Sequence, residues 1–284
     1  MLIAFIALLV ILLYLFMKRA NDNTKDVMIN HIKVGPPQDH QHQVLTILQL
    51  SDLHLENISI SPTELYDQIK DEKIDIIALT GDFLDRKRTI PKLIPYLQML
   101  NKLKPRYGIY AVLGNHDYVL KGQHLQHLKD TLKQHNVTVM HNQHHTITVH
   151  GQQVNIIGVD DFSTKRSDLS QSYRGIKHGT NLVLTHDPNL VLDMKEYHFD
   201  YLLAGHFHGG QICYPKAYHL AKMGKLARMN IVKGLHHQNG SPYYINEGLG
   251  QTGVNIRVGS RPEITFHQLS LATEEKEQKI NPAI

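Results

Sequence analysis

The sequence contains a single cysteine, Cys213, and no tryptophan among its 284 residues. One cysteine excludes an intrachain disulfide and any zinc or iron–sulfur site built from several thiolates. A large charge excess is also missing, because 30 basic residues face 26 acidic ones, and a formal charge of +4 does not by itself indicate nucleic-acid binding. Histidine is abundant, with 21 copies. Spacing decides whether these histidines indicate metal binding, acid–base chemistry or only surface composition.

Charged residues are absent from the first 17 positions, which read MLIAFIALLVILLYLFM. The run is apolar on all sides, unlike an amphipathic core helix, and approaches the length of about 20 residues that crosses a bilayer. Lys18 and Arg19 follow the run, and no small-residue cleavage site is present, which disfavours a secretory signal peptide. We therefore predict an uncleaved single-pass membrane anchor at residues 1–19. Because basic residues follow the run and none precedes it, the positive-inside rule places the remaining chain in the cytoplasm.

Four segments are predicted along the chain. After the anchor, residues 20–43 are polar, contain the Gly35-Pro36-Pro37 break and are predicted to form an irregular tether. From residue 44 to residue 270, apolar strand patterns alternate with helical ones in the first half, and strands dominate the second half, which predicts one α/β domain with layered sheets. Residues 271–284 form a polar tail. Buried strands are predicted at 44–50, 74–80, 107–113, 181–185 and 200–204, further strands at 137–140, 146–150 and 154–159, a β-rich region at 242–269, and helices from Ser61, over 91–104 and over 123–135.

A polar cluster follows each of the five buried strands directly. The clusters are Ser51-Asp52-Leu53-His54, Gly81-Asp82, Gly114-Asn115-His116-Asp117, His186-Asp187-Pro188 and Gly205-His206-Phe207-His208-Gly209-Gly210. Ligands bind at the carboxyl ends of strands in layered α/β folds, so these clusters are expected to converge. Asp and Asn offer oxygen and neutral imidazole offers nitrogen, a donor set suited to Mn, Fe, Zn or Co. An extended backbone would let Asp52 and His54, and likewise His206 and His208, chelate as pairs.

The blocks D-x-H, G-D, G-N-H-D, H and G-H-x-H, in this order over residues 44–269, resemble the signature of the calcineurin-like metallophosphoesterases. The G-H-x-H-G-G-Q form, the Glu247-Gly248-Leu249-Gly250 motif and the stretch from Arg257 to Ile264 resemble a bacterial, membrane-associated branch that includes enzymes cleaving UDP-2,3-diacylglucosamine. The resemblance implies a four-layer α-β-β-α sandwich with two divalent metal ions per chain.

Residue roles also come from the resemblance. It implies that Asp52, His54 and His208 hold the first metal, that Asn115, His186 and His206 hold the second, and that Asp82 bridges both. His116 is implied to be a catalytic residue facing the scissile phosphate, and Asp117 to orient its imidazole by accepting the other N–H. The implied reaction is in-line attack of a metal-bound hydroxide on a phosphodiester or pyrophosphate, with His116 protonating or stabilising the leaving group. Asp85 and Asp187 are interpreted as turn or helix caps.

Two regions outside the blocks remain to be assigned. The histidines at 124, 127, 135, 141, 144, 145 and 150 have no carboxylate or cysteine at ligand spacing, so we interpret them as surface residues. Residues 212–233 mix apolar and basic side chains, which leaves open an ordinary surface excursion or a cap that touches lipid or an anionic substrate.

The leading hypothesis is a membrane-anchored phosphohydrolase acting on a small-molecule or lipid-linked phosphoester. One alternative is a nuclease or nucleotide phosphodiesterase of the same superfamily. No nucleic-acid partner is expected, because the sequence lacks a basic stripe interleaved with aromatic residues. A non-catalytic metal-binding protein is disfavoured, because all expected ligands and His116 are present. The oligomeric state stays open.

Overall fold

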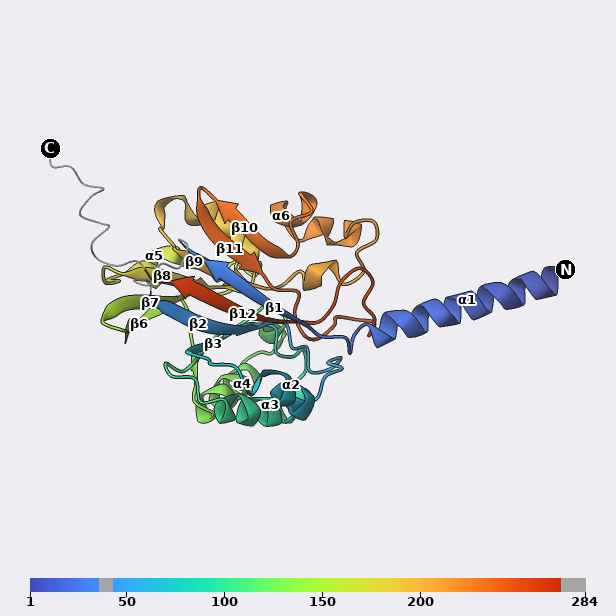
Figure 1. The fold of residues 1–284 in the computed structure, drawn as a ribbon, viewed down its shortest axis with the longest axis horizontal. Coiled ribbons are helices and arrows are strands. Elements are labelled where there is room, and N and C mark those ends of the chain that lie inside the picture. Colours follow the sequence, from blue (N-terminus) through green and yellow to red (C-terminus); the bar gives the residue numbers. More distant parts are fainter. Residues whose placement is uncertain (36–42, 272–284) are drawn as a thin grey trace.

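Two stacked six-stranded sheets form the centre of the structure, a computed structural model that describes residues 1–35 and 43–271 (Figure 1). The first sheet consists, in spatial order, of β1 (Met28–Val34), β12 (Glu263–Ser270), β2 (Val44–Leu50), β3 (Ile76–Thr80), β4 (Ile109–Val112) and β5 (Val137–Val139). The second consists of β10 (Gly234–Gln238), β11 (Ser241–Ile245), β9 (Tyr201–Ala204), β8 (Thr180–Leu184), β7 (Gln152–Gly158) and β6 (Gln143–Val149). Strands β2 to β5 run parallel, as do β7, β8, β9 and β11.

Helical layers cover the outer faces of both sheets, which confirms the predicted four-layer sandwich (Figure 1). The helices α2 (Pro62–Ile69), α3 (Ile90–Lys102) and α4 (Gln123–Gln134) cover the first sheet. The second is covered by α5 (Leu169–Tyr173), η3 (Pro188–Glu196) and α6 (Lys225–Arg228). Short 3-10 turns complete the description: η1 (Lys87–Thr89), η2 (Asp117–Val119), η4 (His208–Gly210) and η5 (Tyr218–Lys222).

Side chains of the buried strands point alternately to the two faces of each sheet, and this alternation produces the layers. In β2, Leu48 and Leu50 pack under the helices, whereas Leu45 and Ile47 enter the core between the sheets. Successive side chains of a strand point to opposite faces, so a continuously apolar strand joins two cores at once. A third core lies outside the second sheet and includes Val183 of β8.

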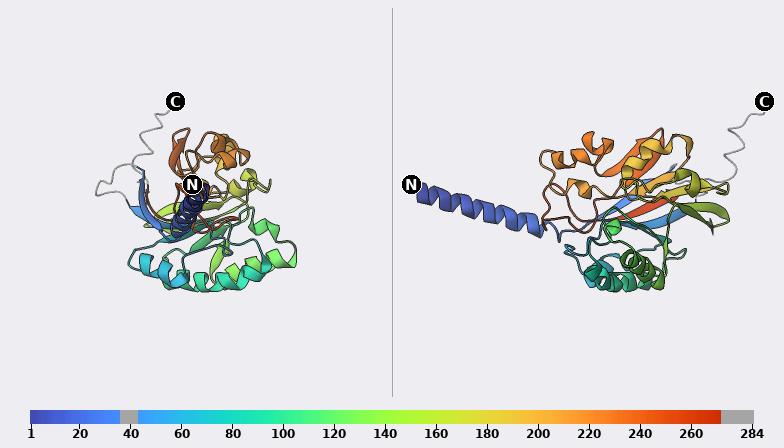
Figure 2. Two further views of the ribbon diagram at one scale, coloured as in Figure 1. Left: turned by 90° about the vertical axis from the view of Figure 1, so that its right-hand side faces the viewer. Right: turned by 180° about the vertical axis from the view of Figure 1, so that it is seen from behind.

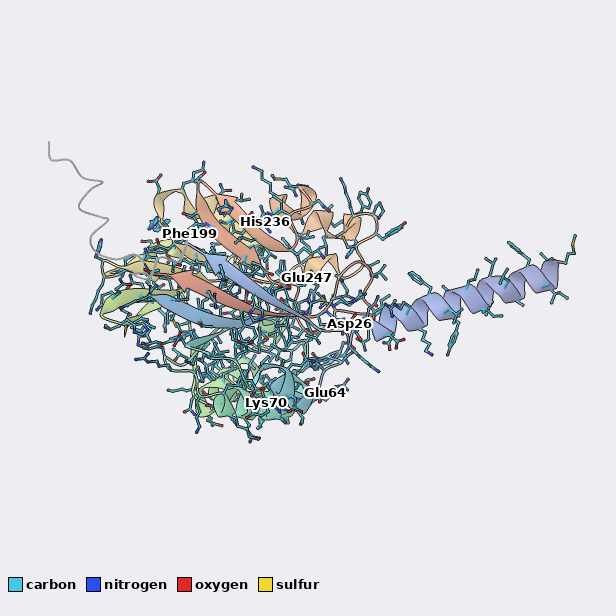
Figure 3. The ribbon with its side chains drawn as sticks, viewed as in Figure 1. Asp26, Glu64, Lys70, Phe199, His236 and Glu247 are labelled. Atoms are coloured by element: carbon cyan, nitrogen blue, oxygen red, sulfur yellow. The ribbon has the colours of Figure 1, made fainter. Side chains whose placement is uncertain are left out.

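Helix α2 begins as the sequence predicts. The hydroxyl of Ser61 accepts a hydrogen bond from the backbone N–H of Glu64 at 3.2 Å, and the Glu64 carboxylate accepts one from the Ser61 N–H at 2.8 Å. This reciprocal capping box, with Pro62 at the first helical position, fixes the start of the helix. Glu64 is labelled on the exposed lower layer in Figure 3.

The segment predicted to be an irregular tether, residues 20–43, contains strand β1, so the prediction was wrong for residues 28–34. Strand β1 pairs in parallel with β12 at the edge of the first sheet. Only Val34 is fully buried in it, because an edge strand faces solvent on one side, and its sequence MINHIKV mixes four apolar residues with three polar ones instead of forming an apolar run. Residues 36–42 of the predicted tether and 272–284 of the predicted tail lie outside the described residues.

Helix α1 (Leu2–Asp22) projects from the domain (Figures 1 and 2) and extends slightly past the predicted anchor at 1–19. Its apolar side chains are exposed along the projecting part, and burial begins at Ala20. By length and composition the helix is sufficient to cross a membrane, although a signal sequence passes the same test.

Strand β1 is expected to contribute measurably to stability. A chain that begins at residue 36 lacks β1, whereas one that begins at residue 28 keeps it. Loss of the buried Val34 side chain and of the half-buried Ile32 should cost roughly 2–3 kcal/mol and lower the unfolding midpoint by roughly 5–10 °C. Thermal unfolding followed by circular dichroism compares the two chains, and equal midpoints would show that β1 is only an accessory.

Candidate active site

Six of the seven predicted metal ligands come together where the carboxyl ends of strands from both sheets meet, and Asn115 lies on the adjoining loop. Asp52, Asp82 and Asn115 follow β2, β3 and β4 of the first sheet. The imidazoles of His186, His206 and His208 follow β8 and β9 of the second sheet. The two sheets are joined just beneath the site, since the side chain of Gln49 donates a hydrogen bond to the Ala204 carbonyl at 2.9 Å.

Two groups of ligating side chains lie side by side. One group is Asp52, His54 and His208, and the other is Asp82, His186 and His206, with the ligand atoms of each group within 4.8 Å of one another. A third set, His54, Asp82 and His116, lies equally close together and shares a residue with each of the two groups. Asp82 reaches both, because its Oδ2 lies 3.1 Å from His186 Nε2 and 3.5 Å from His54 Nε2. The two groups contain six of the seven residues that the family resemblance implies as ligands, and Asn115 is in neither.

The backbone at the site is not extended, contrary to our expectation for the two histidine-containing pairs. Asp52 and His54 have φ values of +49° and +36°, and His206 and His208 have values of +75° and +51°. Asp52 and His54 still meet in one group, but through a turn, whereas His206 and His208 fall into different groups. Non-glycine residues at positive φ typically cost about 1–3 kcal/mol each, so the surrounding packing holds the ligands in strained positions.

Glycines permit a close approach of the backbone to the acidic ligands. A Cβ atom on Gly114 would collide with the carboxylate of Asp82, and one on Gly205 would collide with Ser51 Oγ and the carboxylate of Asp52. Backbone from neighbouring strands can therefore approach the acidic ligands only where no side chain intervenes.

Outer hydrogen bonds fix which imidazole nitrogen faces the site. His186 Nδ1 donates to the Thr80 carbonyl at 2.7 Å, and His208 Nδ1 donates to the Gly250 carbonyl at 3.2 Å. In the neutral ring, Nε2 of each histidine is thereby left as the nitrogen that can bind a metal, the usual arrangement of a metal-binding histidine.

Buried atoms of the site fit divalent cations. His54 Nε2 and Asn115 Oδ1 are buried without a hydrogen-bond partner in the described structure. His206 Nδ1 lies 3.1 Å from His186 Nε2, so two imidazole nitrogens face each other. Buried polar atoms are normally paired, and oxygen and nitrogen acceptors that lack protein donors suit a metal ion.

The ionisation of the ligands differs from one imidazole to the next. Burial would lower the pKa of His54 and His186, but the hydrogen bonds and charges of nearby carboxylates, Asp82 above all, raise the pKa of His54 to about 10 and that of His186 well above its ordinary value. Burial lowers the pKa of His206 to about 3 and holds that of His208 well below its ordinary value, which keeps both imidazoles in the neutral, metal-binding form. Burial opposes the ionisation of Asp82, but the charges of His186 and His54, whose Nε2 atoms lie 3.1 and 3.5 Å from Asp82 Oδ2, outweigh it and hold the Asp82 pKa well below its usual range. An ionised bridging carboxylate is therefore available, and metal binding competes with protons at the neighbouring histidines.

The partner of His116 is Asp85, which corrects two predictions. We expected Asp117 to orient the His116 imidazole and Asp85 to be a turn cap. In the structure His116 Nδ1 lies 2.8 Å from Asp85 Oδ1, while the His116 backbone N–H donates to Asp82 Oδ1 at 2.8 Å. Burial would lower the pKa of His116, but the hydrogen bond with Asp85 and the charge of Asp82 raise it instead.

Asp117 acts on the backbone beneath the ligands. It starts the turn η2, and its fully buried carboxylate turns back under the loops, away from the His116 ring. There it accepts hydrogen bonds from the N–H groups of Asp82, Phe83 and Gly114, each at 2.9 Å. Burial and the nearby charge of Asp82 raise the Asp117 pKa to about 7. Asp117 is therefore a positioning residue that ties the loops after β3 and β4 together.

Arg257 is a positioning residue to which the sequence assigned no role. Its fully buried guanidinium donates to the carbonyls of His208 at 3.2 Å, Gly250 at 2.8 Å and Gly248 at 2.9 Å. Further donation goes to the carbonyls of Glu247 and Arg261. The Gly250 carbonyl also accepts from His208, so Arg257 supports a metal ligand from behind. A motif that contains an arginine does not reveal that the arginine is buried.

The remaining histidines of the middle segment stand apart from the site. None of those between residues 124 and 150 belongs to a metal-ligating group in the described part of the chain. His135 and His144 instead face the backbone carbonyls of Thr131 and Ser172 at 2.8 and 3.2 Å.

A cavity of about 520 Å³ opens over the ligands. Asp82, His116, His206 and His208 line its inner part, and Ile212, His219 and Val254 are among the outer residues. A ligand entering the cavity therefore meets His116 and both metal-ligating groups at once.

The sequence matches the family model described as calcineurin-like phosphoesterase over residues 45–210. The chain belongs to this family. It is 61% identical over 255 residues to the uncharacterized metallophosphoesterase YkoQ of Bacillus subtilis, covering 89% of this chain and 94% of that protein. It is also 26% identical over 273 residues to a protein of Chlamydia muridarum named UDP-2,3-diacylglucosamine pyrophosphatase LpxG, covering 78% of this chain and 82% of that protein.

Among solved structures, the phosphopantetheinyl hydrolase PptH of Mycobacterium tuberculosis aligns with a TM-score of 0.43 at 10% identity, covering 71% of this chain and 88% of that one. The family match and the named relatives make the protein a phosphoesterase of the hydrolase class. The family implies divalent metal ions, and the structure supplies the candidate ligand groups.

Replacing Asp82 with Ala should remove metal from the protein more completely than any other single ligand change. Asp82 lies between the two ligand groups, so its loss deprives both of their shared anion. We expect near-zero turnover with the fold kept, because the strands beneath are apolar and self-sufficient. Asp75→Ala, which removes a carboxylate that accepts from the Thr46 N–H far from the ligands, is the control. Elemental analysis that found undiminished metal in Asp82→Ala would refute the bridging role.

Replacing Asp85 with Asn should slow turnover by roughly 10–100-fold while leaving metal content unchanged, because the partner of His116 is weakened and no ligand is lost. The effect should be smaller when Asp85→Asn is made in a His116→Ala background, since much of it passes through that imidazole, whereas the contact of Asp85 Oδ1 with His54 Nδ1 at 3.5 Å remains. Additive losses in the double variant would show that Asp85 acts independently of His116.

Proposed function

We propose that the protein hydrolyses a phosphodiester or pyrophosphate bond using two divalent metal ions held by the two ligand groups. The observation that carries the proposal is the sharing of Asp82 between these groups at the bottom of a cavity that also contains His116. One shared carboxylate between two neighbouring ligand sets is the arrangement expected of a two-metal phosphohydrolase.

The first ion would be held by Asp52, His54 and His208, and the second by His186, His206 and the Asn115 amide oxygen, with Asp82 between them. Mixed oxygen and nitrogen donors suit Mn, Fe, Zn or Co. When bound, such ions supply positive charge that neutralises the phosphoryl oxygens and makes water more acidic.

His116 supplies a proton to the leaving oxygen. Its Nδ1 is engaged by Asp85, so Nε2 is the ring nitrogen left to carry the transferable proton. The carboxylate of Asp85 stabilises the protonated ring, which lines the cavity together with the ligands.

For the substrate, we propose a lipid- or nucleotide-linked phosphoester such as UDP-2,3-diacylglucosamine. Support comes from the named activity of the Chlamydia relative, which aligns over most of both chains at 26% identity. The apolar helix α1 supports a membrane-linked compound.

For the location, we propose that α1 is an uncleaved single-pass anchor with the catalytic domain in the cytoplasm. Lys18 and Arg19 follow the apolar run and no basic residue precedes it, which favours this orientation under the positive-inside rule. The helix also continues without a break into Ala20, which is buried against the domain.

The activity is tested with purified protein and bis-p-nitrophenyl phosphate. We expect hydrolysis that depends on added Mn²⁺, stops when a chelator is added and returns when Mn²⁺ is restored. The variant Asp82→Ala is the matched negative control. Hydrolysis that persists after complete metal removal would contradict a metal-dependent mechanism.

His116→Ala should keep its metal but lose roughly 10²–10⁴-fold in rate on esters with a poor leaving group. The loss should be smaller for a p-nitrophenyl ester, because p-nitrophenolate needs little protonation. Rates measured across a series of aryl esters separate the two cases. An equal loss across the series would assign His116 an electrostatic role in place of proton transfer.

A further inference from the structure

The end of helix α1 is hydrogen-bonded to the loop that carries Arg257, next to the active site. The Ala20 carbonyl accepts a hydrogen bond from the Arg257 N–H at 2.8 Å, and the Asn23 side chain donates to the Arg257 carbonyl at 2.8 Å. The Asn21 side chain donates to the Asn255 carbonyl at 2.7 Å. Because the Arg257 guanidinium supports His208, a short chain of contacts joins the helix to a metal ligand.

Hydrogen bonds and an ion pair fix the short segment between the end of α1 and the start of β1. The Met28 N–H donates to the Pro262 carbonyl at 2.8 Å as β1 begins, and Asp26 forms an ion pair with Arg261 at 3.0 Å. Asp26 is labelled in Figure 3 at the point where α1 meets the domain. A bilayer crossed by α1 would therefore face one defined end of the domain, the end that surrounds the helix exit in Figure 2.

The catalytic cavity opens at this same end. Its outer residues include Ile212, Thr252 and Val254. The Gln211 side chain donates to the carbonyls of Thr252 and Val254 at 2.9 and 3.1 Å, and Ile212 bridges to Val258. The rim of the cavity thus belongs to the loop that holds the end of α1.

Several large apolar side chains are exposed to solvent at this end. The relevant residues are Ile212 (44% exposed), Tyr214 (84%), Tyr218 (67%), Met229 (57%) and Val254 (58%), which we call the helix-side face. Residues 212–233 also carry five basic side chains and no acidic one. All five are exposed, and one of them, Lys233, forms an ion pair with Glu247 at 2.9 Å. Tyrosine and aliphatic side chains among basic residues suit the headgroup region of an anionic bilayer.

We propose that the helix-side face rests on the lipid bilayer crossed by α1, and that the active site takes from that bilayer a phosphoester whose hydrocarbon part stays in the membrane. The inference rests on the proposed phosphohydrolase function and narrows its substrate to a lipid-linked class. It also favours the lipid-contacting reading of residues 212–233 over an ordinary surface excursion. A soluble substrate would need neither an apolar rim nor a fixed helix exit at the cavity mouth.

Contact with the bilayer is tested on the full chain reconstituted in vesicles of phosphatidylcholine and phosphatidylglycerol. In a Cys213→Ser background, a fluorophore is attached at Tyr214→Cys, at Tyr218→Cys or, as control, at Lys133→Cys. Lys133 lies in the last turn of α4, at the edge of the first sheet opposite the site. We expect lipids with nitroxide-labelled acyl chains to quench the fluorophore at 214 and 218 but not at 133. Equal quenching at all three positions would overturn the proposal. An absence of quenching at 214 and 218 would also overturn it, because that face would then be free of lipid.

Access to substrate is tested with two p-nitrophenyl diesters, water-soluble bis-p-nitrophenyl phosphate and bilayer-embedded hexadecyl p-nitrophenyl phosphate. The double variant Lys216→Glu/Arg228→Glu is compared with Lys102→Glu/Lys133→Glu, whose charges lie in the last turns of α3 and α4. Neither pair lines the cavity, so turnover of the soluble diester should be unchanged. Turnover of the embedded diester should fall only in the first variant, by roughly fivefold for each basic residue removed.

The two proposals fail in different ways. If the wild-type chain hydrolyses neither diester with Mn²⁺, the proposed function is wrong. If it hydrolyses the soluble diester but not the embedded one, or if both double variants cleave the embedded diester equally well, only the membrane-facing site is wrong.

Discussion

The carboxylate of Asp82 is the contact on which the rest of the site depends. One oxygen accepts the N–H of His116, and the other lies beside the imidazoles of His54 and His186. The Asp82 backbone N–H is in turn held by Asp117. A buried carboxylate is costly unless it is paired, and here every neighbour that lowers this cost is also a part of the catalytic apparatus.

Apolar packing beneath the site stabilises the fold and so offsets the free-energy cost of burying these polar groups. The strands that end at the ligands are apolar on both faces and belong to two cores at once. Their rigidity holds Asp52, Asp82 and His206 at positive φ, and the adjacent glycines leave room for the carboxylates. The loops therefore carry the backbone strain, and the packed strands contribute the stability that offsets it, which is common at functional sites.

Much of the fold and of the ligand set could be predicted because both depend on local patterns. Apolar runs such as 44–50 mark buried strands, and polar residues directly after them mark a strand-end site. Contacts between distant segments could not be predicted in this way. Asp117 is the neighbour of His116 in sequence, yet Asp85, 31 residues away, is the carboxylate that meets the ring. Likewise, the role of Arg257 depends on burial among carbonyls, and β1 was missed because an edge strand has a weak apolar pattern.

The hydrogen bond from His186 to the Thr80 carbonyl crosses from the second sheet to the first. Metal ions held between His186 and Asp82 would therefore act as a clamp between the two halves of the sandwich, in addition to their chemical role. Binding of such ions to the folded state alone raises its stability by mass action. A cell short of metal would then contain less of this protein as well as a less active form, because the unclamped sandwich opens more often and is degraded faster. Metal supply would in this way set the abundance of the protein through its turnover.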